Sequence, residues 1–155
     1  MSLEKQIQDG IKQAMIAKDK TRLESLRAIK SQILLAETAE GAKLVEDGSL
    51  SDDQILKLIQ KLVKQHQESA DLYTQNNRPE LAEAEIAEAK VMEAFLPKQM
   101  TAEELAAEIK NIIAEVGATS MKEMGKVMGV ASKKLAGKAE GKAIADAVKA
   151  ALSAL

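Results

Sequence analysis

The sequence predicts an all-α protein, and three observations support that fold class. Aromatic residues, which favour strands, are nearly absent from the 155 residues, whereas the helix-favouring Ala, Leu, Lys and Glu are abundant. Apolar residues recur at helical spacing along most of the chain. Ser or Thr followed three residues later by Glu or Gln, a pattern that caps helix starts, occurs at several places. We therefore expect two helical hairpins (four helices) followed by a small three-helix C-terminal subdomain.

The first predicted hairpin begins with a helix over residues 2–18. Leu3, Ile7 and Ile11 share one of its faces, and Gly10 lies inside it at some cost in helix stability. Asp19 is a plausible N-cap for the second helix, which carries apolar residues from 23 to 34. Because the connection is so short, the two helices should be antiparallel neighbours.

The second predicted hairpin follows a surface loop over residues 40–50, which holds two glycines and several acids. Residues 51–54 form a capping box that opens a third helix, and Asn76 and Asn77 end it. Pro79 suits the first turn of the fourth helix. This helix should bury its apolar residues and turn its acids outward: the apolar set is Leu81, Ile86, Ala89, Met92 (or Val91), Phe95 and Leu96, and the acids are Glu83, Glu85 and Glu88.

Pro97 should stop the fourth helix and mark a boundary. We expect a helical N-terminal subdomain over residues 1–96, a linker over 97–100 and a three-helix subdomain over 101–155. The first helix of that last subdomain is expected to begin after Thr101 and to end at Gly117.

The next helix should run over residues 121–135, opened by a capping box of Ser120 and Glu123. A glycine-bounded turn over 137–141 leads to the last helix, whose apolar residues are Ile144, Val148 and Leu152. The helix over 121–135 has an apolar stripe of Met121, Met124, Val127, Met128, Ala131 and Leu135, and an opposite stripe of Lys122, Lys126, Gly129 and Lys133.

The glycines and methionines of this helix differ in what they predict. A methionine stripe is more often core than a ligand groove. Gly125 and Gly129 each cost about 1 kcal/mol relative to alanine, so a close approach should offset them. Gly129 lies between Lys126 and Lys133, where it bares the backbone beside positive charge.

Charge is distributed unevenly along the chain. Residues 1–116 carry 15 Lys and Arg against 21 Asp and Glu, whereas residues 117–155 carry 7 Lys against 3 acids. A basic C-terminal region on an acidic body favours a polyanionic partner, although the same distribution also improves solubility or holds two halves together.

The sequence predicts no catalytic residue, cofactor or metal site. His66 is the single histidine, cysteine is absent, and no nucleophile motif accompanies them. A di-metal bundle would need Glu three residues before His66, where Val63 stands, and the acids of the fourth helix lack the spacing of a calcium loop. A nucleotide-binding P-loop is also missing, although the turn at 137–141 could present backbone N–H groups to a phosphate.

Nucleic acid would be held by lysines, since the C-terminal region has no Arg or aromatic residue for reading or stacking bases. Recognition of shape and phosphate suits structured RNA, with strong salt dependence. The predicted RNA-binding residues are Lys126, Gly129, Lys133, Lys134, Gly137, Lys138, Gly141 and Lys142.

Several blocks stand in order along nearly the whole chain: KDKTRL at 18–23, LR at 26–27, KLVKQ at 61–65, ESA at 68–70, RPELA at 78–82, FLPKQ at 95–99, MGKVMG at 124–129 and GKAEG at 137–141. In these blocks the chain resembles the small, stand-alone GatB/YqeY-domain proteins of bacteria. Two positions depart from that family: Glu140 stands where Asp is usual, and His66 where a basic residue is more usual.

The resemblance implies an all-helical protein whose tail is similar to the C-terminal region of the B subunit of glutamine-dependent tRNA amidotransferase. In that enzyme the tail helps to hold tRNA, and the chemistry belongs to a separate catalytic domain. The resemblance therefore implies a non-catalytic tRNA-binding or amidotransferase-accessory protein, with tRNA and amidotransferase or other translation-related proteins as partners.

Two alternatives stay open. The chain could be a protein–protein interaction module with no RNA role, in which the lysines only solubilise it. Family naming suggests a carbon–nitrogen ligase with glutamine as amido-N-donor, but no nucleophile or nucleotide motif supports that activity. No basic leader and no apolar run of about 20 residues is present, so we expect a cytoplasmic protein away from membranes.

Overall fold

The structure, a computed structural model, describes residues 2–155. Within these residues it contains seven α-helices, one short 3-10 helix and no strand, which confirms the predicted all-α class. The chain divides into two compact units, Met1–Leu96 and Pro97–Leu155, here called the N-terminal and C-terminal units. Over the described residues, no helix combines the length and the apolar character needed to cross a membrane.

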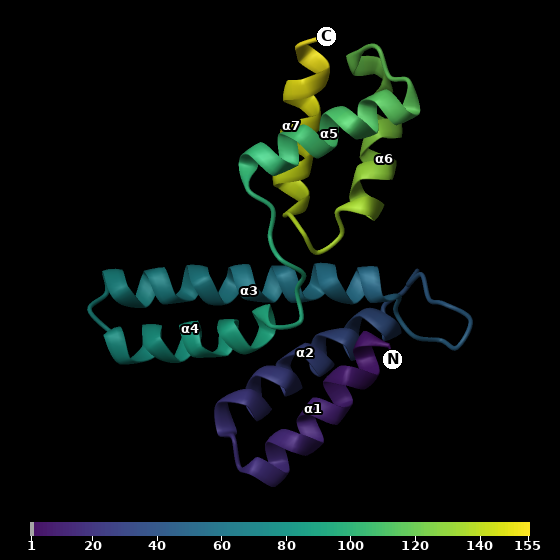
Figure 1. Ribbon diagram of the computed structural model, residues 1–155. Coiled ribbons are helices and arrows are strands. Elements are labelled where there is room, and N and C mark those ends of the chain that lie inside the picture. Colours follow the sequence, from purple (N-terminus) through teal and green to yellow (C-terminus); the bar gives the residue numbers. More distant parts are fainter. Residues whose placement is uncertain (1) are drawn as a thin grey trace. The chain divides into compact units, whose positions relative to one another are not determined.

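The first hairpin of the N-terminal unit consists of α1 (Leu3–Ala17) and α2 (Lys20–Thr38), which lie side by side (Figure 1). Lys18 ends α1 in the left-handed conformation with φ 56°. The carboxylate of Asp19 then accepts a hydrogen bond from the backbone N–H of Arg22 at 3.1 Å, so Asp19 is the N-cap that the sequence predicts. A left-handed residue followed at once by an N-cap leaves the two helices antiparallel.

Gly10 is buried where α1 crosses α2. A Cβ atom at this position would lie 3.0 Å from Cδ1 of Leu26, which is itself fully buried. The missing side chain thus lets the two helices approach closely, which offsets the low helix propensity of glycine.

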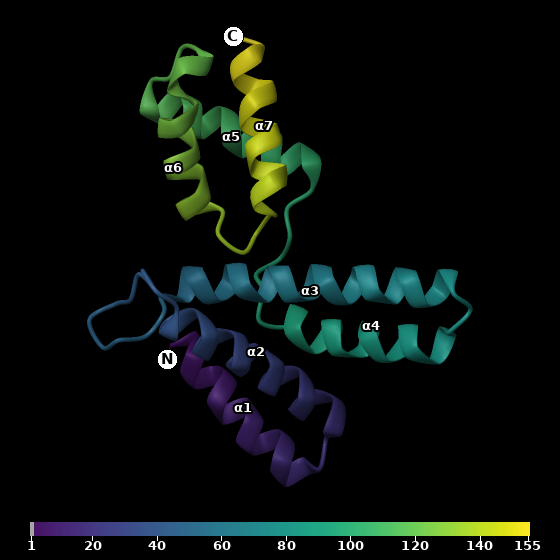
Figure 2. The same ribbon diagram turned by 180° about the vertical axis from the view of Figure 1, so that it is seen from behind.

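The second hairpin consists of α3 (Asp52–Gln75) and α4 (Pro79–Glu93), which run side by side in both views (Figures 1 and 2). Ser51 and Gln54 form the predicted capping box at the start of α3. Pro79 occupies the first turn of α4, where its missing N–H would have no helical partner. The segment between α2 and α3 is a loop, as predicted, and its last residues bring Leu50 into the core.

The face that α4 turns toward the core differs from the prediction. Leu81 and Ile86 are exposed, whereas Ala82, Ala89 and Met92 are buried. The buried face of α4 runs through Ala82, Ala89 and Met92, and the larger Leu81 and Ile86 lie at its edges. Small residues on this face let α4 lie close to α3. The helix also ends at Glu93, before the three residues that precede Pro97.

The acids of α4 also depart from the prediction that they face outward. Glu83 is exposed, but Glu85 and Glu88 are half-buried against His66 of α3. Glu85 lies on the buried line of α4, three residues after Ala82, so helical geometry carries its side chain toward α3.

The core of the N-terminal unit is aliphatic and draws on all four of its helices. Most of its members are Leu and Ile, each of which contributes about 1.5–3 kcal/mol when fully buried. The buried cluster comprises Leu3, Ile7, Leu26, Ile29, Ile33, Leu50, Ile55, Ile59, Leu62, Val63 and Met92.

The C-terminal unit contains α5 (Ala102–Val116), the 3-10 helix η1 (Met121–Glu123), α6 (Met124–Lys134) and α7 (Gly141–Ser153). As predicted, the hydroxyl of Thr101 caps α5, and Gly117 ends it with φ 69°. Its separate core comprises Leu105, Ile109, Ile112, Ile113, Ala118, Val127, Ala131, Leu135, Ala139, Ile144, Val148 and Leu152.

The start of α6 is not the predicted capping box. The side chain of Ser120 makes no capping hydrogen bond. The carboxylate of Glu123 instead accepts hydrogen bonds from Thr119, which hold the pKa of Glu123 below its usual value. The chain therefore passes through one 3-10 turn, and the regular helix begins at Met124.

Residues 97–100 are hydrogen-bonded to the C-terminal unit. The backbone N–H of Met100 donates to the carbonyl of Lys138 at 2.9 Å, and Nε2 of Gln99 donates to the carbonyl of Gly137 at 2.6 Å. These bonds fasten the segment that enters α5 to the turn between α6 and α7.

We predict that residues 97–155 fold without the rest of the chain. The unit has its own buried cluster and its own helix caps, although about 60 residues is near the lower limit for an independent core. Circular dichroism of the isolated segment should show a helical spectrum and a cooperative thermal transition. A gradual, non-cooperative loss of signal would contradict this division of the chain, and the full-length chain supplies the reference curve.

Candidate basic interface of the C-terminal unit

The lysine face predicted on α6 is present. Lys126, Gly129 and Lys133 stand at positions i, i+3 and i+7 of one regular helix and are all exposed. A Cβ atom added to Gly129 would meet nothing within 4 Å, and the same holds for Gly125. Within the described residues no neighbouring helix approaches Gly125 closely, so the close approach expected there is wrong, and Gly129 leaves open backbone between two lysines.

The opposite face of α6 packs into the core. Val127 and Ala131 are buried, and Met124 and Met128 are partly buried against the same cluster, in agreement with a structural role for those two methionines. Met121 is 39% exposed, and its sulfur accepts a hydrogen bond from the Ser153 hydroxyl at 3.6 Å. Because η1 interrupts the helical phase before Met124, Met121 does not continue the buried stripe.

The lysines near this face differ in what they already bind. Nζ of Lys126 donates to the carbonyl of Val116 at 3.0 Å, at the C-terminus of α5, and Nζ of Lys134 lies 2.6 Å from a carboxylate oxygen of Glu115. Both contacts are exposed, and exposed pairs of this kind hold a side chain weakly. No hydrogen bond or ion pair to Lys133 is found among residues 2–155. Lys133 is thus the most available cation of the face.

The turn after α6 is less open than predicted. Gly137 is buried and has φ 77°, and both its carbonyl and that of Lys138 accept hydrogen bonds from residues 99 and 100. Gly137, one of the predicted RNA-binding residues, is therefore not open to solvent, and the presentation of N–H groups by this turn stays a prediction. Gly141, at the start of α7, and the side chains of Lys138 and Lys142 are exposed.

A hollow of about 570 Å³ lies beside this turn, and both lysines and acids line it. Lys134 and Lys138 are among the predicted site residues, but Lys98 is not. No local sequence pattern indicates that the segment 97–100 lies beside the turn between α6 and α7. Glu104 and Glu108 partly offset the positive charge here, so the hollow is less favourable to a polyanion than the face of α6. Its remaining lining residues are Pro97, Met100 and Leu135.

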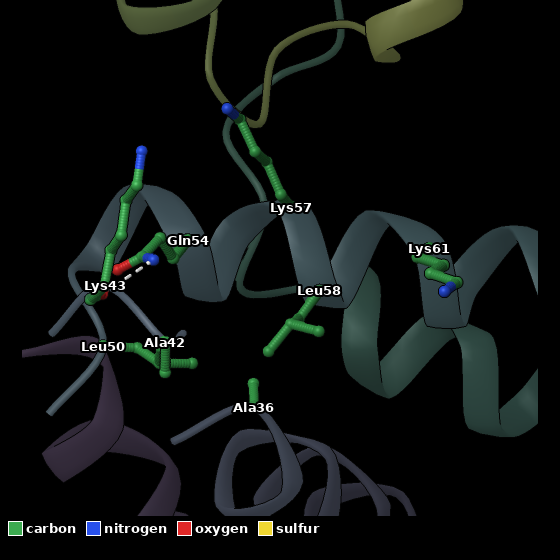
Figure 3. A pocket seen from close by; sticks show the side chains of 8 residues that line it. All are labelled: Ala36, Ala42, Lys43, Leu50, Gln54, Lys57, Leu58 and Lys61. Atoms are coloured by element: carbon green, nitrogen blue, oxygen red, sulfur yellow. Dashed lines mark hydrogen bonds between the residues drawn. The ribbon is translucent and has the colours of Figure 1, made fainter. Parts of the chain in front are cut away.

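The N-terminal unit has a second concave surface, a pocket of about 330 Å³ (Figure 3). Apolar side chains of Ala36, Ala42, Leu50 and Leu58 face its interior, and the side chain of Gln54 donates to the carbonyl of Lys43 at 3.0 Å. Lys43, Lys57 and Lys61 stand around it, with the ammonium groups of Lys43 and Lys57 extending away from the apolar side chains. An apolar group that also carries negative charge would match this lining. Sequence reasoning missed the pocket because it depends on how the loop before α3 folds back.

Comparison with known proteins gives two findings. The chain matches the protein family described as Yqey-like protein over residues 4–152. It is also similar to a protein of Lachancea thermotolerans named altered inheritance of mitochondria protein 41, mitochondrial, with 29% identity over 112 residues. That match covers 71% of this chain and 57% of the Lachancea protein, so the chain spans little more than half the length of this relative.

Proposed function

Because the chain belongs to the Yqey-like protein family, we propose that it binds tRNA without catalysing a reaction, alone or as an accessory of an amidotransferase-type complex. Family membership supports a domain like the tail of the amidotransferase B subunit. The binding of tRNA by that tail supplies the analogy on which the finer proposal rests. The proposal places the protein in the cytoplasm, whereas the Lachancea relative is named as mitochondrial.

The observation that carries the proposal is the exposed face of Lys126, Gly129 and Lys133. Lysine ammonium groups act as point charges toward phosphates, and each contact releases counterions from the nucleic acid. Gly129 has open space where a side chain would stand, so a sugar-phosphate backbone could approach the helix between the two lysines. This arrangement suits recognition of backbone shape rather than of bases.

A double charge reversal, Lys126→Glu with Lys133→Glu, tests the proposal. We expect affinity for tRNA at about 50 mM salt to fall on the order of tenfold or more, because two phosphate contacts become repulsive. The slope of log affinity against log salt should decrease by about two. Fluorescence anisotropy with labelled tRNA measures both quantities, and circular dichroism verifies that the variant remains folded.

The matched control is Lys57→Glu with Lys61→Glu, which makes the same change in charge on exposed lysines of α3. If the proposal is right, this control binds tRNA within about twofold of the parent chain. Equal losses in the two double variants would show a general charge effect, and unchanged binding by the α6 variant would exclude the face of α6.

A second candidate is a protein-interaction module, favoured by the apolar pocket of the N-terminal unit. The pocket combines an apolar interior with Lys43, Lys57 and Lys61 around it, which suits an apolar side chain beside a carboxylate. A protein partner held there would stay bound after RNase treatment, would be released by the Lys57 and Lys61 reversals, and would be retained by the α6 variant.

A further inference from the structure

The hairpin of α3 and α4 brings together three side chains that are far apart in the sequence. Nδ1 of His66, on α3, is hydrogen-bonded to Oε2 of Glu85 on α4 and lies 3.5 Å from Oε2 of Glu88, one turn further along α4. One nitrogen or oxygen from each of these residues lies within 4.8 Å of the other two. The imidazole therefore faces two carboxylates across the helix pair.

The cluster is partly shielded from solvent. The exposed fractions of the side chains are 16% for His66, 24% for Glu85 and 26% for Glu88. Burial raises the pKa of Glu88, the negative charges of Glu85 and of Glu24 on α2 raise it further, and His66 acts in the opposite direction. Two carboxylates thus share a half-buried position that favours an added positive charge.

We propose that His66, Glu85 and Glu88 form a binding site for a divalent transition-metal ion of the Zn²⁺ type. One imidazole nitrogen and two carboxylates are a donor set for such ions, whereas Mg²⁺ and Ca²⁺ favour oxygen ligands throughout. Two ligands of a tetrahedral Zn²⁺ ion lie roughly 3.4 Å apart when the bonds are about 2.1 Å, close to the 3.5 Å between Nδ1 of His66 and the Glu88 oxygen.

The ion would enter where the His66–Glu85 hydrogen bond now lies. Its charge would compensate both carboxylates, and the imidazole would bind it in the neutral form. Three protein ligands leave at least one coordination position for water. Because the ligands come from α3 and α4, the ion would also cross-link the second hairpin.

Isothermal titration calorimetry of the full chain with ZnCl₂, after EDTA treatment and dialysis, tests the site. We expect one Zn²⁺ per chain and a higher Tm in its presence. His66→Gln on α3 and Glu88→Gln on α4 should each weaken binding by at least about tenfold, since even outer partners of a metal ligand contribute 10–100-fold. The two variants lie on different helices, so the test remains decisive if one of them does not fold.

Glu83→Gln is the matched control, because it removes an exposed carboxylate from the same helix. It should bind Zn²⁺ within about twofold of the parent chain. Co²⁺ provides an independent readout: its visible absorption bands should appear with the parent chain and with Glu83→Gln, and should be lost with His66→Gln. Absence of Zn²⁺ binding at 100 µM, or equal affinity in the His66, Glu88 and Glu83 variants, would overturn the proposal and leave the three residues as an ion-paired contact between helices.

Discussion

Replacing Ile29 with alanine is expected to lower the free energy of unfolding of the N-terminal unit by about 2–5 kcal/mol. Ile29 is fully buried on α2, a helix that contacts each of the other three helices of that unit. The substitution removes apolar contacts and leaves a cavity that the surrounding aliphatic side chains cannot fill completely. Urea unfolding followed by circular dichroism measures the loss, and hydrogen exchange assigns it to the peptides of the N-terminal unit.

Ile16→Ala is the control for this prediction. It makes the same chemical change in the same unit, but Ile16 is 84% exposed near the end of α1. We expect the free energy of unfolding to change by no more than about 0.5 kcal/mol, as is usual for surface positions. Similar losses for Ile16→Ala and Ile29→Ala would mean that the two residues are not in the environments described here.

Gly137→Ala is expected to destabilise the C-terminal unit by about 1–3 kcal/mol. Gly137 is buried with φ 77°, a conformation that strains any residue with a Cβ atom. Relief of this strain would shift the turn and weaken the hydrogen bonds that the carbonyls of residues 137 and 138 accept from residues 99 and 100. Hydrogen exchange should show faster exchange at the N–H of Met100 and in neighbouring peptides.

Gly129→Ala makes the same substitution with the opposite expected sign. Gly129 lies inside α6, and the new methyl group would meet nothing within 4 Å, so the variant should gain roughly 0.5–1 kcal/mol. If RNA approaches the backbone at Gly129, as proposed, this more stable variant should bind tRNA more weakly. Equal or tighter tRNA binding by Gly129→Ala would contradict a role for the open backbone. A loss of stability would instead contradict the open space described at this position.

The helices of this protein follow from local signals in its sequence. Asp19, Ser51, Thr101 and Gly117 each occupy the cap position that the pattern predicts. Such caps depend on a side chain and the backbone within one turn, so they can be recognised without knowledge of the rest of the fold. The predicted N-cap that fails is Ser120, because the Glu123 carboxylate takes Thr119 as its partner instead.

The candidate sites could be predicted only in part, because some of them lie on one helix and others depend on contacts between helices. The face of α6 was predictable because Lys126, Gly129 and Lys133 lie on a single helix. The pairing of His66 with Glu85 was not, because it requires knowing which face α4 turns toward α3. Apolar spacing favoured a face containing Leu81 and Ile86, whereas the close packing of the hairpin selects the alanine face that carries Glu85.

The two uncompensated glycines of α6 have a consequence for its motion. Gly10 of α1 recovers its conformational cost through contact with Leu26, but Gly125 and Gly129 meet no neighbour that would do the same. Each lowers helix stability by about 1 kcal/mol relative to alanine, within a helix of 11 residues. Local opening of α6 is therefore favoured over opening of α5 or α7. The segment that carries the lysine face is the one whose fluctuations a bound polyanion would damp most.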